Sequence, residues 1–393
     1  MRILINALSA RLGGGQTYLA NLLSVPPGGK EVEIFLLAPG SLEVPGNSES
    51  LTRIPASPFV ENPVTRAVWE RIFLPRLVRR LQADVLFCPG GMIGARVPRG
   101  CKTVTMFRNM MPFDRRQRRR YPWGYMRARN WILRRLMLQS LARADGVIFL
   151  SQFGRQVIER YLPSLGERAA VIPHGVHPAF RAPSNARPRW LPAGEYLLYV
   201  SILDVYKAQL EVVRAFGIFR KERHTREKLV LAGPARSDYA RRVRREIARL
   251  GLENDVLLVG DVPHQDLPAL YQHASVNLFA SECENCPNIL IEMLAAGRPL
   301  LCSNCPPMPE IAADAAVYFD PHDPEDLAAK LLDLIDSPLR LRELSDQVRK
   351  RSERFDWAAS ARATWDWICK TAGQPALEFQ PPEELAPLQE QIR

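Results

Sequence analysis

The sequence predicts an α/β protein built from two doubly wound, Rossmann-like domains that face a central cleft. Short apolar runs alternate with helical patterns in the first half of the chain, and the alternation restarts at Tyr196 after a segment rich in proline and arginine. Strands and helices in alternation produce a parallel sheet covered by helices. The length of 393 residues fits two domains of roughly 150 to 200 residues each.

The first domain is expected to span residues 1–182. Its strand candidates are 2–8, 32–37, 51–54, 84–88, 103–107, 146–150 and 169–172. Gly13, Gly14 and Gly15 follow the first candidate strand, and a helix is expected to begin at Gln16. A glycine-rich turn before a helix lets the backbone approach an anionic ligand closely, although a plain tight turn explains the same pattern.

A linker is expected at 183–192, followed by the second domain at 193–354. The strand candidates of that domain are 196–200, 229–232, 256–259, 276–279, 299–302 and 317–319. Ligands of such sheets bind beyond the carboxyl ends of the strands. The first of these ends leads to Lys207 and an amphipathic helix. The final segment, 371–393, is rich in proline and glutamate and is expected to be flexible.

Composition restricts the class of protein. A hydrophobic content of 47% with 24% charged residues is typical of a globular protein. The opening MRILINALSA resembles a strand rather than a signal peptide, and no run of about 18 apolar residues is present. We therefore expect a cytoplasmic protein, peripheral at most at the inner face of the membrane.

The stretch SECENCPNILIEMLAAG, at 281–297, carries the strongest functional signal. Pro287 and Gly297 predict a helix of roughly two to three turns between them. Glu284 precedes this helix and Glu292 lies within it, so both carboxylates can face the same side. A helix N-terminus binds phosphate, and carboxylates accept hydrogen bonds from sugar hydroxyls. Phosphate and polyol together indicate a nucleotide sugar.

The spacing Glu, seven residues, Glu within S-x-x-E…LIEMLAAGRPLLCSN…PEI resembles the donor-site signature of the retaining glycosyltransferases of family 4, which have the GT-B fold. Glu284, Glu292 and Gly297 match its fixed positions. The resemblance covers about residues 1–370 and is weaker in the first half. It implies transfer with retention and a helix at 355–370 that crosses back to the first domain. We expect no cofactor, and no divalent metal should be needed, because the protein itself supplies positive groups to the diphosphate.

The resemblance also assigns donor-binding roles to residues at matching positions. Lys207 would neutralise the β-phosphate, Glu284 would hold hydroxyls of the donor sugar, and Glu292 would hold the ribose diol. Lys207 and Glu284 are therefore candidate catalytic residues. The remaining donor-side candidates are Gly14, Gly15 and Gly175 in the first domain, and Cys286, Asn288 and Ile289, whose N–H groups would face the sugar phosphate.

Two positions depart from the family pattern. Arg108 stands where many members have a histidine beside the donor sugar, and Ile202 stands where an arginine would join Lys207 in a clamp on the diphosphate. Arg108 stays a catalytic candidate because a guanidinium can bind a sugar hydroxyl or an anionic acceptor, although an ordinary cation at a strand end is equally compatible. The departures leave open a non-catalytic protein of this fold that binds a sugar nucleotide or a partner.

The formal net charge of +11 is concentrated in one segment. Between Arg108 and Arg135, ten arginines face the single acid Asp114. From Trp123 onward the following apolar residues recur at helical spacing: Met126, Trp131, Leu133, Met137 and Leu141. Contact of Arg115–Arg135 with an anionic membrane surface or a phosphate-bearing acceptor fits this pattern. A helix packed on its own sheet and, less favoured, an anionic-polymer or nucleic-acid binder are the alternatives.

Seven cysteines without a secretory signal indicate reduced thiols. Cys283, Cys286, Cys302 and Cys305 have a spacing compatible with a zinc site. The first two flank Glu284 in a loop that must admit the nucleotide, so we favour ordinary loop or core cysteines.

These patterns together predict a hexosyltransferase. The donor would be a UDP, GDP or ADP sugar, and the acceptor a hydroxyl of a glycan or lipid-linked glycan, with no nucleic acid as partner. The difficult step would be departure of the diphosphate, whose developing negative charge is stabilised by fixed cations and helix N-termini.

Overall fold

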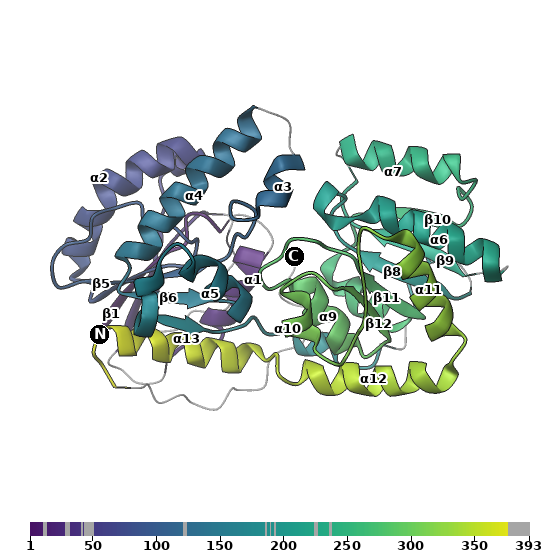
Figure 1. Cartoon of the computed structure of the whole chain (residues 1–393). Coiled ribbons are helices and arrows are strands. Elements are labelled where there is room, and N and C mark those ends of the chain that lie inside the picture. Colours follow the sequence, from purple (N-terminus) through teal and green to yellow (C-terminus); the bar gives the residue numbers. More distant parts are fainter. Residues whose placement is uncertain are drawn as a thin grey trace. The chain divides into compact units, whose positions relative to one another are not determined.

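The computed structural model describes residues 1–10, 14–27, 32–40, 42, 51–120, 124–184, 187–188, 190–191, 194–223, 227–235 and 238–375. The chain forms two compact units, of which the first is Met1–Gly175 with Asp356–Arg393 and the second is Val176–Phe355. Each unit contains one parallel sheet with helices packed against it (Figure 1).

The first unit is built on a seven-stranded parallel sheet with the order β3-β2-β1-β4-β5-β6-β7. All seven strands expected from the sequence are present, with ends that differ by two residues at most. Their bounds are β1 Arg2–Asn6, β2 Glu33–Ala38, β3 Leu51–Pro55, β4 Val85–Cys88, β5 Lys102–Phe107, β6 Gly146–Phe149 and β7 Ala169–Val171. The central strands β1, β4 and β6 are almost fully buried, which explains their continuous apolar sequences.

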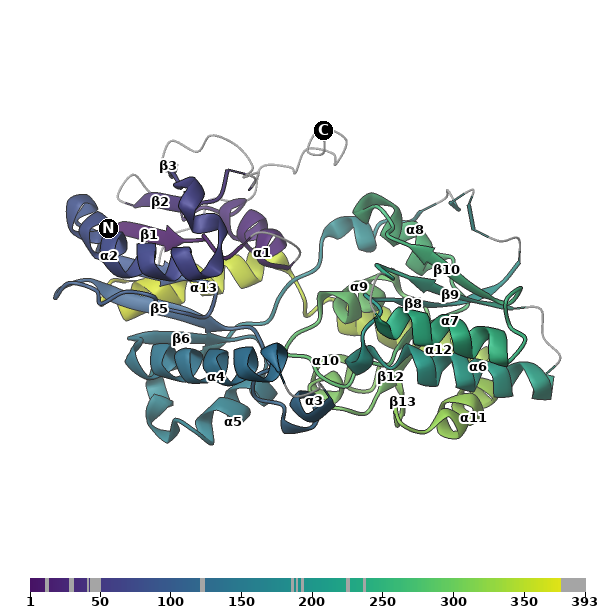
Figure 2. The ribbon, with the colours of Figure 1, turned by 90° about the horizontal axis from the view of Figure 1, so that it is seen from above.

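Helices cover the sheet of the first unit. They are α1 Gly14–Leu23, α2 Pro63–Leu81, α3 Arg115–Arg120, α4 Tyr125–Arg143, α5 Gln152–Glu159 and α13 Trp357–Thr371. In Figure 1, β6 lies between α4 and α13, and Figure 2 shows α13 beside α1. The Tyr18 and Thr364 hydroxyls are 3.2 Å apart, and the Trp365 indole donates to the carbonyl of Val25 at 2.8 Å. The last helix of the chain therefore completes the first unit.

The second unit is built on a six-stranded parallel sheet with the order β10-β9-β8-β11-β12-β13. All six expected strands are present. Their bounds are β8 Tyr196–Val200, β9 Lys228–Ala232, β10 Val256–Gly260, β11 Val276–Phe279, β12 Leu300–Ser303 and β13 Val317–Phe319. The direction of strand addition reverses between β8 and β11, which are neighbours in the sheet. Loops that leave the carboxyl ends of these two strands therefore lie next to each other, the usual position of a ligand site in this class of fold.

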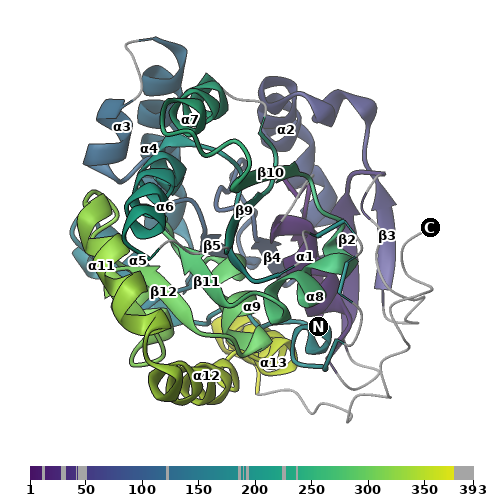
Figure 3. The same ribbon diagram turned by 90° about the vertical axis from the view of Figure 1, so that its right-hand side faces the viewer.

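Seven α-helices are described in the second unit. They are α6 Gln209–Arg223, α7 Asp238–Arg249, α8 Leu267–Gln272, α9 Asn288–Ala296, α10 Met308–Ala312, α11 Pro324–Ile335 and α12 Pro338–Ser352. Figure 3 shows α6 and α7 on one side of the strands and α8 and α9 on the other. Helix α11 packs against α6, and α12 packs against α9. Among the described residues, no helix of either unit combines the length and the apolar character that a bilayer span requires.

Candidate functional site

Helix α9 is the structural centre of the candidate donor site. It runs from Asn288 to Ala296. The end agrees with the sequence-based expectation, but the helix starts one residue later, because Pro287 is its N-cap and not its first helical residue. The side chain of Pro287 cannot accept a hydrogen bond, so the helix start has no side-chain cap. Gly297 ends the helix in the left-handed conformation, at φ 70°, and a Cβ there would lie 2.7 Å from the side chain of Arg349. Glycine is therefore required at the end of the helix for two reasons, the left-handed backbone conformation and the lack of space for a side chain.

The loop before α9 is held by the ends of three strands. The amide of Glu282 donates to the carbonyl of Tyr206 at 2.8 Å, which joins the loop after β11 to the loop after β8. The hydroxyl of Ser303, at the end of β12, donates to the carbonyl of Ser281 at 2.6 Å. These backbone contacts position Glu284, which lies in the loop before α9 and not in the helix itself.

Lys207 and Glu284 form an ion pair at this junction. The ammonium of Lys207 contacts Oε1 of Glu284, and the hydroxyl of Ser281 donates to the same oxygen at 2.6 Å. The two side chains are only 7% and 15% exposed. The sequence predicts both residues in donor binding, but it does not predict that they compensate each other. Substituting only one residue of such an enclosed pair should destabilise the protein, because the remaining charge is desolvated and has no partner.

Aromatic rings enclose the lysine. Its ammonium lies 4.9 Å from the ring centroid of Tyr206 and 5.7 Å from that of Phe279. The hydroxyl of Tyr199 donates to the carbonyl of Lys207 at 2.7 Å and fixes the backbone at this point. Burial raises the pKa of Tyr199 well above its ordinary value, so the phenol stays protonated and remains a donor.

Glu292 is held from a second direction. The hydroxyl of Tyr271, in α8, donates to Oε2 of Glu292 at 3.2 Å, and Nε2 of His264 lies 3.8 Å from Oε1. The hydrogen bond and charge of Glu292 raise the pKa of His264 above its usual range, against the opposing effect of burial. A carboxylate has about four lone-pair positions, so Glu292 retains acceptor capacity for a diol. Its assignment to the ribose stays a prediction.

The other candidate donor-binding residues of the second unit lie at the start of α9. Asn288 and Ile289 form the first turn of α9, and Cys286 is buried just before it. Their contact with a sugar phosphate stays a prediction. In the described part of the chain, no group of three or more histidine, cysteine or acidic side chains could hold a metal ion. The zinc alternative for Cys283, Cys286, Cys302 and Cys305 therefore has no assembled ligand set there.

In the first unit, Arg108 meets the glycine-rich turn. Its guanidinium donates from Nη2 to the carbonyl of Gly14 at 2.7 Å and lies 5.2 Å from the ring centroid of Tyr18. Both Gly14 and Gly15 already belong to α1, so the helix begins two residues earlier than the expected start at Gln16. Gly13 lies outside the described residues. Arg108 is thus held in place by residues of α1 and is not an isolated surface cation.

The packing of the first unit requires glycine at position 175. A Cβ at this position would lie 2.1 Å from the backbone nitrogen of Trp357. The ring of His174 packs against the same tryptophan in a tilted arrangement, with ring centroids 5.3 Å apart. The close approach of the chain before α13 therefore requires glycine here, and this packing was not foreseen from the sequence. A role of Gly175 in donor binding stays a prediction.

The arginine-rich segment forms α3 and α4. The helical spacing predicted from Trp123 onward is present in α4, although Trp123 itself lies outside the described residues. Met137 and Leu141 face the core, but Trp131 is 58% exposed. The predicted apolar series is therefore divided between the core and the solvent-facing side of the helix, which bears on the choice between the alternatives for this segment.

Sequence reasoning missed several polar residues near the donor loop. Nε2 of His322 lies 3.2 Å from Oε2 of Glu282, whose side chain is almost fully buried. His264 and Tyr271, the partners of Glu292, were also not identified. For Glu282 the sequence did carry a signal, because this acid stands two residues before the motif residue Glu284. The two histidines and the tyrosine gave none, because they reach the loop from distant segments.

Two family profiles match the chain. The family described as Glycosyltransferase Family 4 matches residues 12–180, and that described as Glycosyl transferases group 1 matches residues 186–354. The D-inositol 3-phosphate glycosyltransferase 2 of Catenulispora acidiphila is 31% identical over 183 residues, which cover 44% of this chain and 43% of the relative. The chain spans about half the length of the curated relatives that it matches first.

Solved structures share the fold along nearly the whole chain. Sucrose-phosphate synthase from Thermosynechococcus elongatus is similar with a TM-score of 0.72 and 19% identity, covering 92% of this chain and 96% of that one. HepE from Anabaena is similar with a TM-score of 0.70 and 16% identity, covering 95% and 99%. The two profiles match most of the sequence between them, and the two sheets have the architecture of these structures. The chain belongs to the family 4 glycosyltransferases, which have the GT-B fold.

Proposed function

We propose that this protein transfers a hexose from a nucleotide diphosphate sugar to a hydroxyl acceptor, with retention of the anomeric configuration. The observation that carries the proposal is the enclosed pair of Lys207 and Glu284 before α9, in a chain whose two halves match this family. HepE of similar fold was solved in complex with UDP-glucose, which supports UDP sugars as the first donors to test.

The reaction breaks the bond between C1 of the sugar and the β-phosphate oxygen. The electron pair stays on that oxygen, the acceptor hydroxyl oxygen bonds to C1, and its proton passes to the released diphosphate. Positive groups aimed at the leaving oxygen lower the barrier most, because the charge there increases toward the transition state. Lys207 supplies such a charge, and the N–H groups at the start of α9, around Asn288 and Ile289, supply a helix terminus.

The ion pair gives Lys207 a compensating partner before the donor arrives. We propose that the diphosphate then takes over part of the lysine's interaction. Glu284 is freed in part to accept hydrogen bonds from the hydroxyls of the sugar. The short contact of Ser281 with Glu284 keeps the carboxylate oriented during this exchange. Glu292, oriented by Tyr271, would accept both hydrogen bonds of the ribose diol.

In the first unit, we propose that Arg108 and the turn at Gly14 and Gly15 contribute to binding the donor or an anionic acceptor. The guanidinium is already oriented by the Gly14 carbonyl and by the ring of Tyr18. An oriented guanidinium loses little freedom when it binds an anion. This arrangement replaces the histidine that many family members have at this place.

The first unit also carries a surface suited to an anionic membrane. Large apolar side chains are exposed on the two longest helices of the first unit. They are Val64, Val68, Ile72 and Phe73 on α2, and Tyr125, Trp131, Ile132 and Leu136 on α4. Arginines interleave with them on both helices. Apolar and cationic side chains together match the acyl boundary and the anionic headgroups of a bilayer, so we propose a lipid-linked acceptor.

Transfer to a mixed pool of acceptors tests the proposal directly. Purified protein is incubated with UDP, GDP or ADP sugars and membrane lipid extract, and release of the nucleoside diphosphate and of a glycosylated product is measured. Product formation with one donor that is lost in the Glu292→Ala variant supports the proposal. Donor binding without transfer or hydrolysis for any sugar would favour a non-catalytic binding protein of the same fold.

A further inference from the structure

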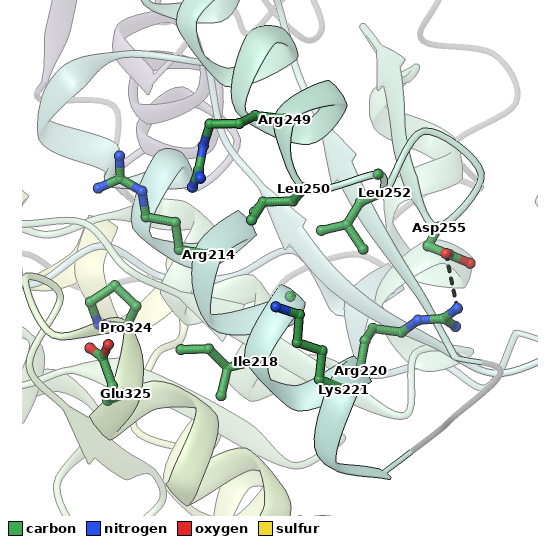
Figure 4. Close-up of a pocket in the computed structure, with 12 residues that line it drawn as sticks. Arg214, Ile218, Arg220, Lys221, Arg249, Leu250, Leu252, Asp255, Pro324 and Glu325 are labelled. Carbon is green, nitrogen blue, oxygen red and sulfur yellow. Dashed lines mark ion pairs between the residues drawn. The ribbon is translucent and has the colours of Figure 1, made fainter.

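A hollow of about 450 Å³ lies on the second unit, away from the donor residues. It is formed by the C-terminal half of α6, the connection from α7 to β10, and the start of α11 (Figure 4). None of Lys207, Glu284 and Glu292 lines it. Its volume falls within the range of sites that hold small molecules, roughly 300 to 1,000 Å³.

The floor of the hollow is apolar. It is formed by Gly217, Ile218, Leu250, Leu252 and Pro324. A Cβ at Gly217 would lie 3.4 Å from Cδ1 of Leu250 and 3.5 Å from Cδ1 of Leu252, so the two leucines pack closely over the glycine. Such a floor suits the carbon face of a ring or chain, which gains free energy when it leaves water.

The rim is cationic even after its ion pairs are counted. Arg214 and Arg249 share one acid, Glu246, at 2.7 Å each. The hydrogen bonds from Arg249 and then Arg214 lower the pKa of Glu246 to about 2, so this acid is charged at neutral pH. Two arginines against one carboxylate leave a positive excess of one at this side of the hollow.

Lys221 adds a charge that no acid among the described residues compensates. It makes no ion pair with any described residue, and Figure 4 shows its ammonium directed into the hollow, between Ile218 and Leu250. Arg220, one residue earlier, turns away and binds Asp255 at 2.9 Å. The exposed carboxylate of Glu325 lies at the opposite edge, where it can accept hydrogen bonds.

We propose that this hollow binds a small phosphorylated polyol. The phosphate would contact Lys221 with Arg214 and Arg249, since a phosphate monoester carries between one and two negative charges near neutral pH. The hydroxyls would donate to Glu325, and the apolar face of the molecule would lie on the floor at Ile218. The combination of cations, one acceptor and an apolar floor selects this class over a purely apolar ligand or a bare anion.

Calorimetric titration tests the site, with glucose 6-phosphate and inorganic phosphate as the probes. Saturating UDP is present throughout, so that the nucleotide site is occupied. We expect saturable binding of glucose 6-phosphate, weakened about tenfold or more by Lys221→Gln, because a hydrogen bond to a charged group contributes more free energy than one between neutral groups. Lys350→Gln is the matched control, because Lys350 is an exposed helical lysine of the same unit outside the hollow.

Three outcomes decide the proposal. Glu325→Gln should weaken glucose 6-phosphate and leave inorganic phosphate unchanged, since only the polyol reaches that carboxylate. Lys207→Ala should retain the binding, which separates this site from the donor site and from the proposed transfer activity. The absence of saturable binding, or equal affinities in the Lys221→Gln and wild-type proteins, would overturn the proposal. Among the described residues Lys221 has no ion-pair partner, so its variant should melt at the wild-type temperature.

Discussion

The two units handle charge in opposite ways. In the second unit, the charged residues of the donor site are enclosed and compensated: Lys207 by Glu284, and Glu292 by Tyr271 and His264. In the first unit, the arginines of α3 and α4 lie largely on the surface among exposed apolar side chains. Compensated, enclosed charges give directional recognition of a small ligand, whereas exposed cations give salt-dependent attraction to an extended anionic surface.

The difference has a consequence for mutagenesis. Removing one member of an enclosed pair strands its partner, so stability and activity change together. Removing an exposed side chain of α4 leaves the fold intact, so only association changes.

The largest effect is expected for Lys207→Ala. Loss of a cation that stabilises the departing diphosphate should lower kcat by about 100-fold or more. The same change leaves Glu284 without its ion pair and should lower the melting temperature by several degrees. Steady-state kinetics with the preferred donor and thermal denaturation measure the two effects.

A double variant separates the two roles of the lysine. Lys207→Ala combined with Glu284→Gln removes both charges and should recover most of the lost stability without recovering activity. Recovery of kcat together with stability would show that Lys207 acts only by holding the loop. Lys350→Ala, on the surface of α12, should alter neither quantity.

The next effect concerns Glu292. If Glu292 makes the two proposed hydrogen bonds to the ribose diol, replacement by alanine should raise the donor KM about 30-fold or more, with a smaller change in kcat. Tyr271→Phe removes only the hydrogen bond that orients the carboxylate and should raise KM about threefold. Isothermal titration with the nucleoside diphosphate gives the corresponding affinities. Equal affinities for wild type and Glu292→Ala would place the ribose elsewhere.

The fold was predictable, and a candidate site could be chosen from the sequence, because the signals for both are local. Alternating apolar runs located every described strand, and Pro287 with Gly297 located both ends of α9. The candidate residues Glu284 and Glu292 were selected from the spacing within one short motif. Local periodicity and end signals act within a few residues, so they are readable without knowledge of the topology.

The contacts within the site were not predictable because they depend on strand order. Lys207 and Glu284 are 77 residues apart and meet only because β8 and β11 are neighbours in the sheet. The requirement for glycine at 175 depends on a chain segment that returns at Trp357. The exposure of Trp131 was equally hidden, because helical spacing predicts an apolar face without saying what covers it.

Binding to lipid vesicles tests the exposed apolar and cationic surface of α4. We expect the protein to bind phosphatidylcholine vesicles that contain phosphatidylglycerol, and the double change Trp131→Ser with Ile132→Ser to weaken this binding about tenfold. Added salt should weaken the wild type further. Sedimentation with the vesicles measures the bound fraction. Leu339→Ser is the control, because Leu339 is 68% exposed but lies in the second unit. Equal losses in both variants would show a general hydrophobic effect and no membrane face.

The smallest effect concerns pH and returns to the enclosed side. Glu292 raises the pKa of His264, while the neighbouring His177 has its pKa lowered by burial and by the charge of His264. A raised pKa in the folded protein means that the pair stabilises the fold below the ordinary histidine pKa, and that this contribution is lost as pH rises through the raised value.

Deprotonation of His264 also frees Glu292 from its imidazolium partner. Donor affinity should therefore increase about two- to threefold between about pH 6 and pH 8.5, in keeping with the small free energy of a long ion pair. Titrations of nucleoside diphosphate across this range should show the increase in wild type and a flat profile in His264→Gln, and a parallel slope in both proteins would assign the pH dependence to another group.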